Sequence, residues 1–338
     1  STYMPPSGAE ARAAQVATLT RIAHARFISD TIGQLLDDLE VEFSGSEHDS
    51  YEASLVRATR RKYDRERKLS SQLVAELKKA TALGESAWEK AREISDFDAF
   101  RPHLQHVVDL TIQKAEALGY DDRIYDALLD EHEPQMSTAR VEALFGEMKT
   151  ELVPLARAIS AQQPDAADPM SLLPYDEQKQ WDFGIDVITR IGFDFDRGRQ
   201  DRSAHPFTTS FAPSDVRLTT RVLRDRFTSA LFSSIHEAGH GTYEQGIDPK
   251  LDRTPLAACA SLGVHESQSR MWENVVGRSR PFWAFWLPRL KAYFPSQLSG
   301  IGLEDFYRAI NRVQLSPTRV EADEVTYNLH IFLRFDIE

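Results

Sequence analysis

Two histidines and a glutamate at helical spacing are the residues best suited to chemistry. In "HEAGH", His236 and His240 lie four positions apart, and Glu237 directly follows the first histidine. Residues four apart on an α-helix lie on one face, about 6 Å apart along the axis, so both imidazoles can bind one metal ion. Glu237 lies roughly 100° further round the helix, where it can serve as general base toward a water beside the metal. The pattern predicts a hydrolytic zinc site, and the alternative is a polar helix with two surface histidines.

A third ligand must come from another part of the chain. The chain has one cysteine, Cys259, which we expect to be a small buried residue, so zinc sites built from several cysteines are excluded. Glu266 in "HESQSR" is the best candidate, because a helical hairpin can fold the next predicted helix back onto the first. Its neighbour His265 is a rival. Two histidines with one glutamate and an open fourth position form a known hydrolytic zinc arrangement, which favours Glu266 and leaves His265 for substrate.

Glu273 lies seven residues beyond Glu266 and returns to the same helical face. We expect its carboxylate to accept a hydrogen bond from a ligand histidine, although a solvent-exposed glutamate fits the sequence equally well. Cobalt and manganese also accept nitrogen and oxygen ligands, so Zn²⁺ is the first expectation for the metal, with Co²⁺ or Mn²⁺ as alternatives.

The elements that position these residues can be read from hydrophobic periodicity. The stretch 225–246 predicts the helix that carries the two histidines. Directly before it, residues 205–222 predict a two-stranded hairpin broken by Pro-Ser-Asp. Alternation in its second strand places Val216, Leu218 and Val222 on one face, and Asp215, Arg217, Thr219 and Arg221 on the other. The polar hairpin is therefore placed to align an extended peptide beside the metal.

Most of the remaining chain predicts helices. Helical patterns fill residues 9–163, with long runs from Ala9 to Glu42 and from Ser46 to Leu83, and a further helix is expected from Tyr175 to Ile191 after a loop at 160–174. The later helices are predicted to be interrupted at Gly84, Pro102, Gly119, Pro134 and Pro154. The aromatic residues of "RSRPFWAFWLPRLKAYFP" are expected in a core. We divide the chain into an N-terminal helical part, 1–204, and a hairpin and zinc-binding helical part, 205–338.

Composition excludes several classes of protein. The chain has 338 residues and a net charge of −12, which argues against a nucleic-acid partner because such proteins need a basic face. No stretch approaches ~18 consecutive apolar residues, so no membrane span is expected. We see no signal peptide. These features predict a cytoplasmic protein.

Several motifs together resemble one family. "HPF" at 205–207, "DVRLT" at 215–219, "HEAGH" at 236–240, "HES" at 265–267 and "RVEAD" at 319–323 follow one another in the order typical of the thermostable carboxypeptidase Taq family of zinc metallocarboxypeptidases. "TYMPPSGAEAR" near the start is also similar to the family's N-terminal segment. The resemblance spans essentially the whole chain and is far more specific than the zinc signature alone.

This resemblance implies a mainly helical fold, like that of neurolysin and angiotensin-converting enzyme, with a small sheet beside a deep groove. It implies the removal of single residues other than proline from peptide C-termini, and a homodimer. It also assigns the metal to His236, His240 and Glu266 and the base to Glu237.

A carboxypeptidase must also bind a free carboxylate, which arginine does best through its planar fork. Arg319 in the last motif is the first candidate, with a surface charge as its alternative. Arg217 is the second, and an ion pair with Asp215 is equally expected. Tyr327 and His330, three positions apart, either line the groove or pack together, and His205 either shapes its loop or touches substrate.

The chain departs from the family in one respect. The family's later G-x-x-Q-D-x-H-W motif and the tyrosine-rich segment after it are absent, and so is the acidic segment before T-x-M-P. We therefore expect one catalytic domain truncated at both ends, with its metal ligands complete and the tyrosines that stabilise the oxyanion missing. The alternatives to a carboxypeptidase are a related zinc endopeptidase or dipeptidase, and a catalytically incomplete metal-binding fragment.

Overall fold

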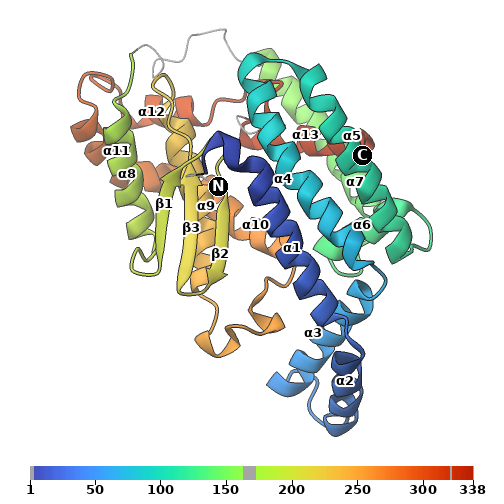
Figure 1. Cartoon of the computed structure of the whole chain (residues 1–338). Coiled ribbons are helices and arrows are strands. Elements are labelled where there is room, and N and C mark those ends of the chain that lie inside the picture. The colour runs from blue at the N-terminus through green and yellow to red at the C-terminus, as the bar shows by residue number, and fades with distance from the viewer. Residues whose placement is uncertain (1–3, 163–172, 320–321, 338) are drawn as a thin grey trace. The chain divides into compact units, whose positions relative to one another are not determined.

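The computed structural model describes residues 4–162, 173–319 and 322–337, and its chain divides into two compact units (Figure 1). The first comprises Ser1–Thr138 and Lys250–Ala258, and the second Ala139–Pro249 and Cys259–Glu338. Most of the loop expected at 160–174, and parts of the segments at 2–12 and 319–323, lie outside the described residues. The division at residues 204 and 205 stays a prediction.

The first unit is helical. After a short 3₁₀ turn, Pro6–Gly8, its helices are α1 (Ala9–Phe27), α2 (Asp30–Glu42), α3 (Tyr51–Glu66), α4 (Ser71–Ile94), α5 (Phe97–Leu118) and α6 (Ile124–His132), and a 3₁₀ turn at Pro255–Ala257 packs on α3. The long helix α4 packs along both α1 and α5. The two long helical runs are thus each divided, the second at Ser70, whose hydroxyl caps α4 by accepting from the Leu73 N–H.

The predicted interruptions of helices are wrong at three of the five positions. Gly84 lies inside α4, where Val107 of α5 comes within 3.7 Å of where its Cβ would be, so the small residue permits close packing. Pro102 lies inside α5 and Pro154 inside the helix that follows α6. A proline removes one backbone hydrogen bond, and both helices continue past it. Gly119 and Pro134 do lie between helices.

The second unit combines helices with a small sheet. Its elements are α7 (Thr138–Gln162), α8 (Glu177–Arg190), β1 (Gly198–Arg202), β2 (Thr208–Ala212), β3 (Asp215–Thr220), α9 (Phe227–Gln245), α10 (Leu262–Arg270), a π-helical segment (Met271–Val276), α11 (Arg280–Tyr293), α12 (Leu303–Ile310) and α13 (Glu324–Ile337). A further 3₁₀ turn, Pro249–Leu251, begins at the last residue of this stretch of the unit and continues into residues of the first unit. The predicted fold class, mainly helical with a small sheet, is confirmed.

The sheet contains the predicted hairpin and one further strand. Its order is β1-β3-β2, with β3 antiparallel to β2 and parallel to β1. Val216 and Leu218 are fully buried, as the alternation predicts. Thr219 is also buried, which the alternation does not predict, because its hydroxyl bonds to Ser203 and to the Phe207 N–H. Val222 lies beyond the end of β3.

Helix α9 is the central element of this unit. It contacts β2 and β3, α8 and α10, and Figure 1 shows it lying behind the sheet. The expected aromatic core is confirmed, since Trp283, Trp286 and Phe294 of the aromatic segment are almost completely buried against α8 and α9. Neighbours on several sides hold α9 in place, so any side chain it carries is positioned by the core.

Within the part of the chain that the structure describes, no helix is both long enough and apolar enough to cross a membrane.

Candidate metal centre

A glycine lets α9 and α10 approach closely enough for their side chains to meet. A Cβ on Gly239 would come within 2.6 Å of the Ser269 Cα and 2.8 Å of the Gln268 carbonyl oxygen, which no real side chain tolerates. Helix α10 begins after Ser261, whose hydroxyl accepts from the Val264 N–H. Glu266 therefore lies in the second turn of α10, next to the part of α9 that carries the histidines.

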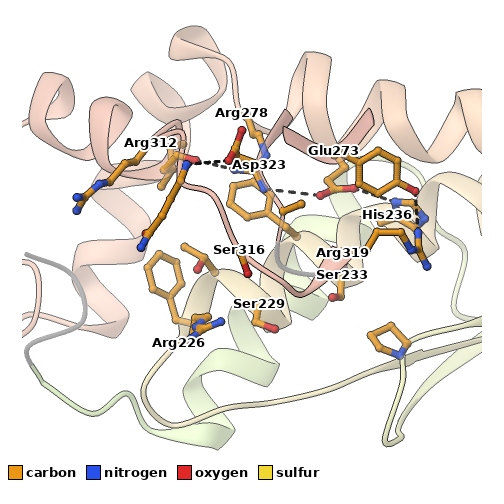
Figure 2. Close-up of a pocket in the computed structure, with 18 of the residues that line it drawn as sticks. Arg226, Ser229, Ser233, His236, Glu273, Arg278, Arg312, Ser316, Arg319 and Asp323 are labelled. Atoms are coloured by element: carbon orange, nitrogen blue, oxygen red, sulfur yellow. Dashed lines mark hydrogen bonds and ion pairs between the residues drawn. The ribbon is translucent and has the colours of Figure 1, made fainter. Parts of the chain in front are cut away.

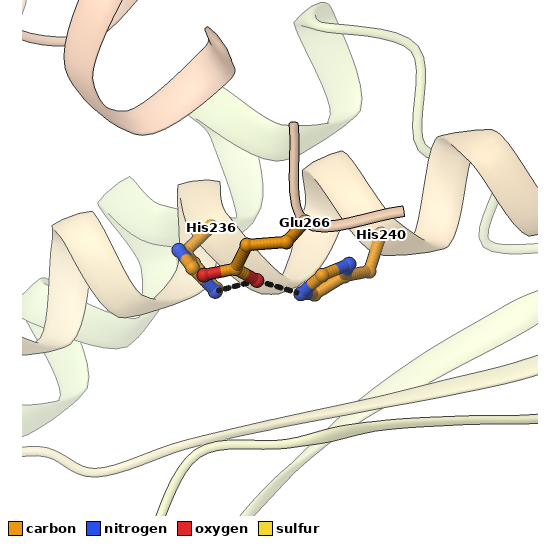
Figure 3. Close-up of side chains that lie close together, drawn as sticks. All are labelled: His236, His240 and Glu266. Atoms are coloured by element: carbon orange, nitrogen blue, oxygen red, sulfur yellow. Dashed lines mark ion pairs between the residues drawn. The ribbon is translucent and has the colours of Figure 1, made fainter. Parts of the chain in front are cut away.

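The three predicted metal ligands lie together (Figure 3). The ligand atoms of His236, His240 and Glu266 all lie within 4.8 Å of one another. The Glu266 carboxylate reaches between the two imidazoles, with Oε2 at 3.2 Å from His240 Nε2 and 3.6 Å from His236 Nε2. The imidazole planes are inclined by 80°, so the two rings address the centre from different directions. Two imidazole nitrogens and one carboxylate oxygen at this spacing fit a divalent cation.

The orientation of His236 is set by Glu273. His236 donates a hydrogen bond through Nδ1 to Glu273 Oε2 at 2.8 Å, which leaves Nε2 directed at the centre. Burial lowers the pKa of His236, but the bond to Glu273 and that carboxylate's charge raise it overall. Glu273 lies in the π-helical segment after α10. The structure thus contains the contact that the sequence suggested for this residue.

The Glu266 carboxylate is held in its charged form. Burial raises its pKa, but the hydrogen bond from His240 and the neighbouring charge of His236 lower the pKa of Glu266 to about 2. Ser269 Oγ also donates to Glu266 Oε2 at 3.1 Å. An anionic oxygen between two imidazoles is the form that a metal ion requires.

Glu237 faces the same cavity from the next position on α9. It is 6% exposed, and burial raises the pKa of its carboxyl group. Thr208 of β2 donates its hydroxyl to Glu237 Oε2 at 2.6 Å. The carboxylate is therefore fixed beside the metal ligands, and a raised pKa suits a group that must accept and return a proton.

His265 packs against one of the metal ligands, His240. Its ring stacks on His240 with centroids 4.3 Å apart, and its Nε2 lies 3.0 Å from Glu244 Oε1. The sequence led us to expect His265 at the substrate, and it is not among the described residues that line the cavity.

A cavity of about 680 Å³ opens beside these residues (Figure 2). Helix α9 forms one wall, with Ser229, Ser233, His236 and Glu237 among its lining residues. Figure 2 shows Arg319 close to His236, while Arg226 and Arg312 lie toward the opposite end of the drawn residues. The cavity therefore extends from the metal ligands along the N-terminal half of α9.

Only some of the other predicted site residues line the cavity. His205, Arg319 and Tyr327 line the cavity, and Arg319 Nη1 donates to the Tyr327 hydroxyl at 2.8 Å. Among the described residues that line it we do not find Arg217, Asp215 or His330. Arg217 instead forms a two-pronged ion pair with Asp215, at 2.8 and 2.7 Å, which is the alternative that the sequence left open.

Sequence reasoning missed three residues of this site. Thr208 bonds the candidate base, and Arg270 and Arg278 lie on the cavity wall within 3.6 and 3.7 Å of Glu273. Arg270 follows Glu266 by four positions on α10, so its placement on the same face was available from the sequence. The contact of Thr208 with Glu237 depends on the packing of β2 on α9 and leaves no signal in the sequence.

Comparison with known proteins agrees with this geometry. A family model described as "Carboxypeptidase Taq (M32) metallopeptidase" matches residues 1–338. The chain is 42% identical over 351 residues to Thermostable carboxypeptidase 1 of Thermus thermophilus, covering 100% of this chain and 68% of that protein. It is 37% identical over 339 residues to Carboxypeptidase 1 of Bacillus subtilis, covering 100% of this chain and 67% of the relative.

A solved structure gives the same result in three dimensions. The carboxypeptidase crystal structure from Deinococcus radiodurans superposes with a TM-score of 0.86 at 40% identity, covering 100% of this chain and 67% of that chain. The family model, the named relatives and the shared fold all concern peptide hydrolases. The chain therefore belongs to the carboxypeptidase Taq family of metallopeptidases, and its function is that of a metallocarboxypeptidase.

Proposed function

We propose that this chain holds one divalent ion with His236, His240 and Glu266, and that Glu237 is the general base for hydrolysis of the C-terminal peptide bond of peptides. The observation that supports this most strongly is the convergence of the three ligand atoms within 4.8 Å beside a buried carboxylate. Membership of a metallopeptidase family independently calls for a metal.

Zinc is the metal we propose first. Two imidazoles and one carboxylate form the ligand set of hydrolytic zinc sites that keep a position open. Cobalt and manganese accept the same nitrogen and oxygen ligands, so the metal is tested by reconstitution.

Glu237 performs the proton transfers in this proposal. A divalent ion bound here would supply Lewis acidity, which acidifies water and polarises a carbonyl group. Glu237 accepts a proton from the attacking water and passes it to the leaving amine, and the Thr208 hydroxyl keeps its carboxylate in position between these steps. Its burial excludes bulk water, which would otherwise compete for that proton.

The substrate is aligned by the sheet and by an arginine. Strand β2 lies at the edge of the described sheet and carries Thr208, so an extended peptide paired with β2 would pass directly over Glu237. Arg319 lines the cavity near His236 and is the first candidate for binding the terminal carboxylate. Arg217, paired with Asp215 away from the cavity lining, is the weaker candidate.

The decisive experiment compares one blocked peptide as its free acid and as its C-terminal amide. The protein is first freed of metal with a chelator and then reloaded with Zn²⁺, Co²⁺ or Mn²⁺. We expect release of the last residue from the acid only after reloading, and no cleavage of the amide. Equal cleavage of both peptides would indicate an endopeptidase, and bound metal without turnover would indicate a metal-binding scaffold.

The homodimer that the family resemblance implies, and the cytoplasmic location that the composition suggests, belong to the same proposal. Light scattering at several protein concentrations tests the first of these.

A further inference from the structure

Arg270 lies one helical turn beyond the metal ligand Glu266 on α10. It follows Glu266 by four positions on α10, so the two side chains lie on one face, about 6 Å apart along the axis. The central carbon of its guanidinium lies over the ring of Tyr327, 4.1 Å from the centroid. The side chain is 23% exposed and lines the cavity. A stacked guanidinium of this kind has little freedom to rotate, so its donors keep one direction.

Within the described ranges, Arg270 makes one long ion pair, with Glu273. The nearest oxygen of that carboxylate, Glu273 Oε2, lies at 3.6 Å, which is beyond hydrogen-bonding distance. Arg278 differs, because its guanidinium donates to the Ile310 carbonyl oxygen and stacks on Phe232. Both arginines line the cavity, but of the two, among the residues that the structure describes, only Arg278 is held by a hydrogen bond to a backbone carbonyl.

Arg319 reaches the same tyrosine from another segment. Its Nη1 donates to the Tyr327 hydroxyl at 2.8 Å, while Arg270 stacks on the ring. One tyrosine on α13 therefore fixes two guanidinium groups at the metal end of the cavity. Two positive charges held this close repel each other, and an anion placed between them relieves that repulsion.

We propose that Arg270 joins Arg319 in a clamp, organised by Tyr327, that binds the α-carboxylate of the C-terminal residue. This inference rests on the proposed function and adds to it a second carboxylate-binding residue. Only three covalent bonds separate the scissile carbonyl carbon from the terminal carboxyl carbon. A clamp one helical turn from a metal ligand matches that short span, so the spacing of Glu266 and Arg270 restricts the enzyme to releasing one residue.

Binding of a ligand that cannot be hydrolysed tests the clamp without relying on turnover. The probe is a blocked dipeptide whose peptide bond is replaced by a ketomethylene group (CO–CH₂), prepared as its free acid and as its carboxamide. Calorimetry on the zinc-loaded protein gives the ratio of the two dissociation constants. We expect the wild type to prefer the acid, and Arg270→Gln to reduce that preference about 10- to 100-fold, because a hydrogen bond to a charged group is lost.

Further variants separate the clamp from a general loss of structure. Arg270→Lys keeps the charge but not the fork and should fall between the wild type and Arg270→Gln. Tyr327→Phe keeps the stacking surface for Arg270 and should lose less preference than Tyr327→Leu. Arg12→Gln, on the exposed face of α1, is the matched control and should leave the ratio unchanged.

Measuring the metal content of Arg270→Gln distinguishes two roles of Arg270. In one it binds the terminal carboxylate, and in the other it only supports Glu273. An unchanged acid-to-amide ratio in metal-saturated Arg270→Gln overturns the inference, including when that variant binds metal more weakly, because Arg270 would then act only through Glu273. Failure of the wild type to hydrolyse any free-acid peptide would reject the proposed function instead. The ratio of the two dissociation constants is measured without turnover, so failure of the clamp and failure of the proposed function can be told apart.

Discussion

The Glu273 carboxylate accepts the Nδ1 proton of His236 at 2.8 Å, from a helical segment that also carries Glu266 into the same site. The side chain that orients one metal ligand and the side chain that supplies another thus belong to one continuous stretch of helix. Burial raises the pKa of Glu273, but the bond from His236 and the charges of Arg278 and Arg270 lower it overall. An ionised Glu273 makes His236 a more basic ligand.

Replacing Glu273 with glutamine should therefore weaken metal binding. Glutamine keeps the shape of the side chain and can still accept a hydrogen bond, but it lacks the negative charge. We expect the dissociation constant for Zn²⁺ to rise about 10- to 100-fold, measured by competition with a chromogenic chelator. Glu93→Gln, at an exposed position on α4, is the matched control. Equal zinc affinity in both variants would show that Glu273 does not support the metal.

The second prediction concerns the close approach of α10 to Gly239 of α9. A methyl group here would overlap Ser269 and Gln268 of α10, so Gly239→Ala must push α10 away and move Glu266 with it. We expect a loss of about 1–3 kcal/mol in the free energy of unfolding and a zinc affinity at least about tenfold weaker. Gly146→Ala is the control, since nothing lies within 4 Å of the added Cβ inside α7. That change should stabilise the helix by roughly 0.5–1 kcal/mol. If Gly239→Ala binds zinc normally, close approach of the two helices is not what positions Glu266.

The sequence predicted the elements whose periodicity is strong. The helix carrying His236 and His240 and the hairpin before it were predicted because their buried faces recur at regular spacing. Strand β1 was missed because its sequence, "GRQDR", is polar throughout and has no apolar alternation. It is a strand because each of its residues has a partner in β3. A strand stabilised by a partner distant in sequence leaves no local signal.

The residues of the site differ in the same way. Those that were predicted follow from a local pattern in the sequence, and the contacts that were missed do not. His236 and His240 follow from spacing within one helix. Glu266 follows from its place on the next predicted helix and from the known arrangement of two histidines with one glutamate. Glu273 was also found, because seven residues return to the same helical face. By contrast, the contact of Arg270 with Tyr327, itself a predicted candidate, joins two helices far apart in the chain, and Thr208 meets Glu237 across the packing of a strand on a helix. These contacts require the tertiary structure.

A third prediction concerns the stability of the first unit. Asp126 of α6 accepts hydrogen bonds from the Thr138 N–H at 2.6 Å, the Thr138 hydroxyl at 2.5 Å and the Arg123 N–H at 3.2 Å. Burial raises the pKa of Asp126, but these bonds lower it below the ordinary value. A carboxylate with a lowered pKa stabilises the fold above its unfolded pKa of about 3.9, and this stabilisation is lost as the pH falls through the folded value.

Asp126→Asn should therefore cost about 1 kcal/mol at pH 7, in the range measured for helix-capping residues. The difference from the wild type should shrink as the pH falls below about 4, where the wild-type carboxyl group also becomes neutral. Urea unfolding followed by circular dichroism at a series of pH values measures both effects. Asp38→Asn, on the exposed side of α2, is the control and should show neither. A deficit that stays constant with pH would contradict the role of the carboxylate charge.

The last prediction separates proton transfer from metal binding. Glu237 lines the cavity with the ligand residues His236 and Glu266, and its carboxylate is held by Thr208. Glu237→Gln keeps the size of the side chain and its bond with Thr208 but cannot accept a proton. We expect full zinc content by atomic absorption and a kcat about 10²- to 10⁴-fold lower on a blocked peptide with a free C-terminus. Thr208→Val should keep zinc and reduce kcat less, because the base remains but is less well oriented. Retention of most of the wild-type rate in zinc-loaded Glu237→Gln would remove Glu237 as the base and assign the proton transfer to another group in the cavity.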